Sequence, residues 1–233
     1  MSDSNSTLGF VLLSGGLDSA VTLAHAIDEH GSENVHAYTC SYGQRHQNKE
    51  QIAAFRLCEY FNVPIIELRV LLGEGGLTDT DLDIPNKSYE ELGEGVSPTY
   101  VPFRNATLLS LMTSHADGQA LKIGKEQQFQ VYYGAHMDDA EGGAYPDCTP
   151  LFVHYMNGVI KVATYHRGRL IAPLINKKKW EVVRYGEGLR VPFGLTWSCY
   201  RGLRVHCGTC PTCIDRRNAF KHAQIADPTE YAA

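Results

Sequence analysis

Residues 14–19 (SGGLDS) combine residue types that suit the binding of an anion. They follow a short apolar run at residues 8–13 and precede a helical pattern that stops at Gly31. At such a strand-to-helix junction, unpaired backbone N–H groups and the positive end of the helix dipole favour negative charge. Glycines let a phosphate approach the backbone, and Ser14 and Ser19 add hydroxyl donors. A phosphate site is therefore expected here, rather than an ordinary glycine turn with an Asp or Ser cap.

Four cysteines near the C-terminal end form a second cluster, Cys199, Cys207, Cys210 and Cys213. Their C-x7-C-x2-C-x2-C spacing allows four thiolates to close on one tetrahedral zinc ion. A zinc site whose four coordination positions are all filled by protein ligands is structural rather than catalytic. A redox CxxC pair and coincidental buried thiols are the alternatives. His206 lies inside the cluster but would be a fifth ligand, so four sulfurs are preferred.

The rest of the chain alternates short apolar runs with helical periodicity. The pattern predicts strands at residues 8–13, 35–40, 64–72, 129–134 and 170–173, and helices before Gly31 and at 50–61, 104–116, 151–156 and 179–186. Residues 73–98 are expected to form a long mobile loop, and residues 117–128 a polar surface excursion. Strands that alternate with helices imply an α/β fold with a parallel sheet and right-handed crossovers.

The composition is that of an ordinary globular chain, with 233 residues, 43% apolar and 20% charged. It excludes collagenous, largely disordered and coiled-coil proteins, and the length suits one domain. No apolar window is long enough for a transmembrane span, and the N-terminus lacks the features of a secretion signal. A cytoplasmic protein is therefore expected, and in that compartment clustered cysteines indicate metal rather than disulfides.

Charge is distributed unevenly along the chain. The net charge of −5 argues against a generic nucleic-acid binder, yet residues 161–222 carry 13 Lys and Arg against three acidic residues. Such asymmetry is typical of a region that handles an anion. A solvated basic face explains the asymmetry equally well, so the asymmetry only supports the prediction of an anion-binding region.

The SGGLDS loop lacks the GxxxxGK[ST] pattern, and with it the lysine that grips β- and γ-phosphates. It instead resembles the pyrophosphatase-type loop of ATP-dependent adenylating ligases. That resemblance implies attack at the α-phosphate, with pyrophosphate held in the loop as the leaving group. An acyl or amide oxygen is activated as its adenylate, and a nitrogen or sulfur nucleophile then displaces AMP.

With both motifs placed, the chain resembles the 7-cyano-7-deazaguanine synthase family over nearly its whole length. Besides the cysteine cluster, the matching segments are residues 14–19 (SGGLDS), 41–46 (SYGQRH), 101–105 (VPFRN), 134–139 (GAHMDD), 145–148 (YPDC), 173–179 (PLINKKK) and 196–200 (TWSCY). The resemblance implies a Rossmann-like parallel sheet flanked by helices, similar to the adenine nucleotide α-hydrolases, with a C-terminal zinc knuckle at about 197–220. It also implies conversion of 7-carboxy-7-deazaguanine, ammonia and ATP to an amide and then, through a second adenylation, to the nitrile, with release of AMP and pyrophosphate.

The resemblance further implies roles for single residues. ATP contacts are expected at Leu13, Ser14, Gly15, Gly16, Leu17, Asp18, Ser19, Ser41 and Tyr42, with Asp18 also contacting Mg²⁺. Arg104 is a candidate for the substrate carboxylate or the α-phosphate, because a guanidinium fork matches such oxygens; its alternative is a surface arginine at a helix start. Lys179 falls on the family's lysine position and is the expected charge stabiliser, whereas Lys177 and Lys178 are expected to be solvated.

Four further residues complete the expected substrate site: Asn105, Asp139, Tyr145 and Asp147. The last three are polar enough to read a deazaguanine edge, although caps and turns around Pro146 would explain them too. Small-molecule substrates, a possible homodimer, and no membrane or direct nucleic-acid partner are expected.

Three positions depart from the family pattern. Phe103 stands where a small residue is common and is expected to narrow the pocket, Gly142-Gly143 lengthens the connection to YPDC, and Thr149 stands where many members carry Arg. The nearest rival function is a related ligase on the same scaffold, one that stops at the amide or passes the activated base to another amine, or a tRNA thiolase. A zinc-knuckle RNA-binding module would explain the basic C-terminal region, but it leaves SGGLDS, YPDC and the parallel-sheet pattern unexplained.

Overall fold

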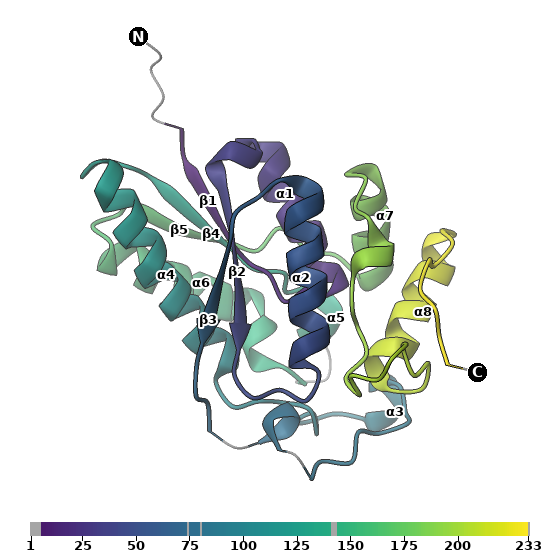
Figure 1. The fold of residues 1–233 in the computed structure, drawn as a ribbon. Helices are drawn as coiled ribbons and strands as arrows, with labels where there is room; N and C mark the ends of the chain where they lie inside the picture. Colours follow the sequence, from purple (N-terminus) through teal and green to yellow (C-terminus); the bar gives the residue numbers. More distant parts are fainter. Residues whose placement is uncertain (1–5, 74, 80, 141–143, 233) are drawn as a thin grey trace.

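A five-stranded parallel sheet forms the centre of the computed structural model, which describes residues 6–73, 75–79, 81–140 and 144–232 (Figure 1). The strands are β1 (Leu8–Leu12), β2 (Val35–Ser41), β3 (Ile65–Arg69), β4 (Phe129–Tyr132) and β5 (Gly168–Ile171), in the order β3-β2-β1-β4-β5. The helices are α1 (Leu17–His30), α2 (Gln47–Phe61), α3 (Tyr89–Leu92), α4 (Arg104–Ile123), α5 (Met137–Ala140), α6 (Pro150–Ala163), α7 (Lys179–Gly188) and α8 (Pro211–Ala223). The predicted α/β class is confirmed.

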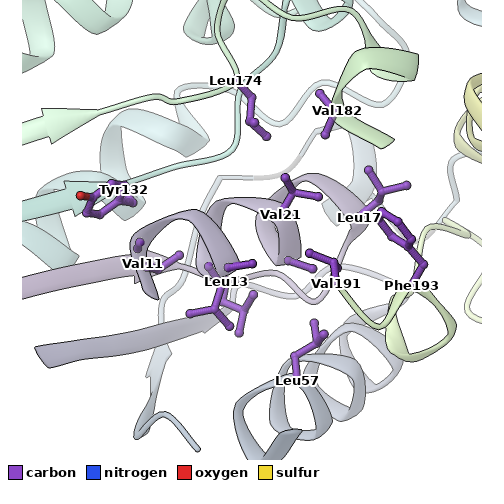
Figure 2. Close-up of a cluster of buried hydrophobic side chains, with 14 of the residues drawn as sticks. Val11, Leu13, Leu17, Val21, Leu57, Tyr132, Leu174, Val182, Val191 and Phe193 are labelled. Carbon is purple, nitrogen blue, oxygen red and sulfur yellow. The ribbon is translucent and has the colours of Figure 1, made fainter. Parts of the chain in front are cut away.

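Helices cover both faces of the sheet (Figure 1). The side chains of β1 divide between two buried clusters, one on each face. Phe10 packs with Leu109 and Met112 of α4 on one face. Val11 belongs to the opposite cluster, which also contains Leu57 of α2, as Figure 2 shows. Because both faces are buried, β1 reads in the sequence as one continuous apolar run instead of an alternating pattern.

The strand order reverses beside β1, since the chain pairs β1 with β2 on one side and later with β4 on the other. In open parallel sheets the crevice outside the carboxyl ends of such a pair is where ligands bind. Gly134 lies just beyond β4, and a Cβ atom there would come within 3.0 Å of the Asp18 backbone. The missing side chain therefore lets the chain after β4 approach the start of α1, which brings the GAHMDD and SGGLDS segments together.

The structure corrects several predicted boundaries. Residues 117–123 continue α4 instead of forming an excursion, because Ala116 and Ala120 extend its buried face. Helix α6 is longer than predicted, since exposed apolar side chains such as Tyr155 and Val162 obscure its periodicity. The expected loop at residues 73–98 contains a 3₁₀ turn at Gly76–Thr78 and the α3 helix. Helix α8 was not predicted at all.

None of the helices within the described ranges is long and apolar enough to cross a membrane. The expected lengthening at Gly142-Gly143 lies outside the described residues.

Candidate active site

A cavity of about 220 Å³ opens at the carboxyl ends of β1, β2 and β4. Most of the predicted site residues line it, namely Leu13, Ser14, Gly16, Leu17, Asp18, Ser19, Tyr42, Arg104, Asn105, Asp139 and Lys179. Four others lie outside its lining: Gly15, Ser41, Tyr145 and Asp147. The cavity thus gathers residues more than 160 positions apart in the chain, and it lies where the strand order reverses.

The SGGLDS loop enters α1 without a side-chain cap, since Gly16 occupies the N-cap position. The Ser14 hydroxyl lies 3.1 Å from the Ser19 hydroxyl and accepts the Gly16 N–H at 3.2 Å. The first turn of α1 therefore has backbone N–H groups that no side-chain cap satisfies. This arrangement suits a phosphate group, as the sequence predicted.

Gly15 holds the SGGLDS loop in place through close contacts on the side away from the cavity. Its φ of +85° is a conformation that favours glycine, and a Cβ atom would lie 2.4 Å from the Glu50 carbonyl oxygen of α2. The Gly15 carbonyl in turn accepts the Trp197 N–H at 2.9 Å. Gly15 therefore fixes the loop between α2 and the C-terminal region rather than facing the cavity.

Replacing Gly15 by alanine is expected to lower the free energy of unfolding by about 3 kcal/mol, because the added methyl group meets backbone atoms that cannot rotate away. Gly16→Ala is the matched control, because Gly16 has a φ of −74° and its Cβ would meet only a serine hydroxyl within 3.4 Å. Thermal or urea unfolding of both variants measures the difference. Equal stabilities would contradict the role given to Gly15.

A cluster of ionisable side chains surrounds Lys179, the first residue of α7. Its Nζ atom donates to Asp18 Oδ2 at 2.7 Å and lies 3.0 Å from His136 Nε2 and 3.5 Å from Asp215 Oδ2. His136 Nε2 also lies 3.3 Å from Asp139 Oδ1. The backbone N–H of Lys179 donates to Asp138 Oδ2 at 2.8 Å, which fixes the start of the helix. The lysine is therefore held at the edge of the phosphate loop.

The same cluster contains two carboxyl groups whose pKa values are shifted in opposite directions. Burial acts to raise the pKa of Asp18, but Lys179 and His136 outweigh it and hold that pKa below its usual range. Burial raises the pKa of Asp139, and there His136 and Lys179 compensate only in part. Burial would lower the pKa of Lys179, yet Asp18, Asp215 and Asp139 raise it overall, so the lysine stays charged. Neighbouring carboxyl groups whose environments shift their pKa values in opposite directions are typical of acid–base sites.

Arg104 begins α4 and lines the cavity opposite the cluster. Its guanidinium donates to the Tyr42 hydroxyl at 3.4 Å and to Asn105 Oδ1 at 3.2 Å. Burial disfavours its charge, but Tyr42, Tyr200 and Asp147 raise the pKa of the group overall, so it stays a cation. Phe103, the preceding residue, is 69% exposed and does not line the cavity, so it does not narrow the pocket as expected.

Tyr145 and Asp147 lie behind the cavity. The Tyr145 hydroxyl lies 2.6 Å from Thr99 Oγ1, and Asp147 Oδ2 accepts the backbone N–H of Asn105 at 3.1 Å. Thr149 caps α6, where its hydroxyl accepts the Phe152 N–H at 3.1 Å. Asp147 therefore fixes the start of α4, and Thr149, which follows the YPDC segment, caps α6.

Sequence reasoning assigned no role to several residues of the site. His136 and Asp215 complete the cluster around Lys179, and the cavity is also lined by Trp197, Ser198, Tyr200 and Thr212. His136 stands four residues after β4, in the GAHMDD segment that carries the resemblance, so its place near the carboxyl edge of the sheet was the available signal.

The four clustered cysteines are all buried, and their Sγ atoms lie within 4.8 Å of one another. Backbone N–H groups point at the sulfurs: that of Cys207 donates to Cys199 Sγ at 3.4 Å and that of Cys210 to Cys207 Sγ at 3.3 Å. His206 Nε2 instead accepts the Ser198 N–H at 3.0 Å. The four sulfurs are therefore positioned to bind a metal ion, as predicted.

Arg216 connects this cysteine cluster to the active site. Its side chain is 1% exposed, donates to Thr196 Oγ1 at 2.7 Å and to the Phe193 carbonyl at 3.1 Å, and pairs with Asp227 at 3.2 Å. These contacts hold the segment whose Trp197 N–H binds the phosphate loop. Contacts of Arg216 therefore link α8, which begins at the cysteine cluster, to the segment that lines the cavity at Trp197.

Comparison with known proteins assigns the chain to a family. The family model described as Queuosine biosynthesis protein QueC matches residues 9–224. The chain is 37% identical to the 7-cyano-7-deazaguanine synthase of Pseudoalteromonas translucida, covering 95% of this chain and 97% of the relative. It is 39% identical to that of Hahella chejuensis, with 94% and 91% covered, and 37% identical to that of Methanospirillum hungatei, with 94% and 97% covered. The cavity, the phosphate loop and the cysteine cluster therefore stand in a chain that belongs to the QueC family of 7-cyano-7-deazaguanine synthases.

Proposed function

We propose that this chain, as one ligase domain with a zinc-binding module at about 197–220, converts 7-carboxy-7-deazaguanine and ammonia to 7-cyano-7-deazaguanine. Two molecules of ATP are consumed, and AMP and pyrophosphate are released at each adenylation. The observation that carries the proposal is the 2.7 Å pair between Lys179 and Asp18 at the phosphate loop, in one cavity with Arg104. Membership of the QueC family supports the nature of the substrate and product.

The two chemical stages pose the same problem. A carboxylate resists attack by ammonia until its oxygen joins a phosphoanhydride, and an amide loses that oxygen only after the same activation. In each stage the substrate oxygen attacks the α-phosphorus, pyrophosphate leaves into the SGGLDS loop, and Lys179 stabilises the charge that develops. Ammonia then displaces AMP to give the amide. After the second activation the C–O bond to AMP breaks with its electron pair leaving on AMP, and the nitrogen gives up its protons to solvent, which leaves the nitrile.

The residues present fit a magnesium ion with the ATP phosphates. Asp18 is held ionised, and its Oδ1 atom is buried without a hydrogen-bond partner in the described part of the chain. A buried carboxylate oxygen without a hydrogen-bond donor suits a hard cation, which would neutralise phosphate charge there. Four thiolates within 4.8 Å likewise suit a single zinc ion in a closed structural site.

Arg104 and Asn105 are placed to hold the anionic base. Arg104 remains charged in the cavity and can face a carboxylate with two N–H groups. Asp147 acts on the substrate through Asn105, whose backbone it holds, and Tyr145 acts through residues 97–99. Both are positioning residues in this proposal.

Asp18→Asn is expected to slow adenylation by about 10²-fold or more, because the amide neither offers an ionised ligand to magnesium nor pairs with Lys179. ATP–pyrophosphate exchange that depends on the carboxylated base measures this step without ammonia. Asp28→Asn, an exposed position on the same helix, is the matched control and should keep the wild-type rate.

The products decide the reaction class. Mass spectrometry of a mixture containing ATP, ammonia and 7-carboxy-7-deazaguanine should detect AMP, pyrophosphate and the nitrile. ADP and orthophosphate as primary products would overturn the adenylation, and accumulation of the amide alone would identify the rival ligase.

A further inference from the structure

A second pocket, of about 460 Å³, lies beside the active-site cavity. Its described lining contains five carboxylic residues and no lysine or arginine; the acidic residues are Glu90, Glu94, Asp138, Asp139 and Asp215. We call it the acidic pocket. The active-site cavity, by contrast, contains Arg104 and Lys179. Phosphates and carboxylates are therefore favoured in the cavity and repelled from the acidic pocket, whereas a small cation is attracted to the acidic pocket.

The two pockets meet at Asp139, which is shared by their described linings. Asp139 faces His136 and Lys179 on one side and is close enough to Asp18 and Asp215 to feel their charges. Burial raises the pKa of Asp139, so a proton is held there more easily than on an exposed aspartate. A group arriving through the acidic pocket thus meets a proton acceptor at the boundary of the active site.

His136 gives a second, independent indication of a ligand. The ring lines the acidic pocket, is 1% exposed, and has no hydrogen-bond partner for Nδ1 among the described residues. Because the Lys179 ammonium can only donate, Nε2 accepts from it, and the neutral ring carries its hydrogen on Nδ1. A buried N–H group without an acceptor is unfavourable, so a small ligand with a lone pair is expected to reach it.

A divalent metal does not explain the acidic pocket. Within the described residues, the four cysteines are the one group of three or more His, Cys, Asp or Glu residues whose ligand atoms converge closely enough to hold a metal ion. The carboxylates of the acidic pocket are thus spread around it instead of meeting at a point. Such a distribution attracts a small monovalent cation without chelating it.

Building on the function proposed above, we propose that the acidic pocket admits the nitrogen substrate as ammonium and that Asp139 takes a proton from it at the boundary. Ammonium gives one proton to the Asp139 carboxylate and becomes ammonia, whose lone pair can accept the His136 N–H before the attack on the acyl adenylate. The lone pair then forms the C–N bond to the acyl adenylate, and the C–O bond to AMP breaks with its electron pair leaving on AMP. The nitrogen then gives its second proton to the phosphate of the departing AMP, which leaves the neutral amide.

The entry of ammonium through the acidic pocket is tested by the double variant Glu90→Gln/Glu94→Gln, since both side chains are exposed and neither is among the groups that shift the pKa of Lys179. The KM for ammonium at low salt is expected to rise about threefold to tenfold, with the KM for ATP and the exchange rate unchanged. Glu59→Gln/Glu126→Gln removes two exposed charges that precede β3 and β4, at the opposite edge of the sheet, and should have no effect. An unchanged KM for ammonium in the first variant would overturn the proposal.

The proton transfer is tested with Asp139→Asn and two nucleophiles. Hydroxylamine is largely uncharged at neutral pH, so it needs no proton acceptor to become nucleophilic. The rate of amide formation from ammonium, taken relative to the rate of hydroxamate formation by the same variant, is expected to fall about 10²-fold below the wild-type ratio. Equal losses with both nucleophiles would overturn the role of Asp139. Absence of exchange in the wild-type protein would instead overturn the proposed function itself, so the two failures are distinguishable.

Discussion

Replacing Lys179 by alanine is expected to abolish both amide and nitrile formation. The lysine lies 2.7 Å from Asp18 at the phosphate loop and stays charged among three carboxylates, so it can stabilise the charge that accumulates at the α-phosphorus. Since both adenylations share that charge, kcat should fall by about 10³-fold or more for each product, with little change in the KM for the base. Product mass spectrometry and ATP–pyrophosphate exchange measure the two effects.

Lys177→Ala is the control for this experiment. Its Nζ atom lies 5.0 Å from the centre of the Tyr185 ring, outside the cluster, and its loss should leave kcat within about twofold of wild type. Circular dichroism and thermal unfolding are needed beside the kinetics, because removing Lys179 leaves Asp18, Asp139 and Asp215 without their shared cation. If folded Lys179→Ala made amide at the normal rate and failed only at the nitrile, the single-site mechanism would have to be abandoned.

The sequence predicted the fold well where burial alone determines the pattern. Strand β1 is covered on both faces, so it appears as a compact apolar run that ends before Ser14, and β2 and β4 keep most of their buried apolar side chains beside a few polar residues such as Thr39 and Gln130. The pattern failed at α6, where Tyr155, Val159 and Val162 are exposed and the helical period is lost. It also failed at α8, whose buried face includes Arg216, a residue that sequence rules place outside the core.

The candidate site was predictable to the extent that its residues stand at strand ends. Asp18, Arg104 and Lys179 follow turns or begin helices, and the structure brings them into one cavity. The sequence could not predict which of these side chains contact one another. No local pattern indicates that His136 lies 3.0 Å from Lys179, or that Asp215 lies close to the same lysine. Such contacts depend on how α7 and α8 pack against the carboxyl edge of the sheet, which only the tertiary structure determines.

Cys210→Ser is expected to cause loss of bound zinc and of folded protein together. The four sulfurs lie within 4.8 Å of one another, so removal of one ligand opens a site whose binding energy, of order 10 kcal/mol for structural zinc, is also folding energy. The Cys210 backbone N–H also donates to Cys207 Sγ, and Cys210 is the N-cap of α8. Metal analysis of purified protein and its yield in the supernatant measure both losses.

The consequences of the Cys210 change should extend to the active site. Helix α8 carries Arg216, which holds the segment around Trp197, and Trp197 in turn binds the Gly15 carbonyl of the phosphate loop. Any Cys210→Ser protein that remains in solution should therefore have lost ATP–pyrophosphate exchange as well. Cys58→Ser, which alters a buried thiol in the core cluster away from the metal ligands, should retain zinc and exchange while losing some stability. Stoichiometric zinc and normal stability in Cys210→Ser would refute the structural role of the cysteine cluster.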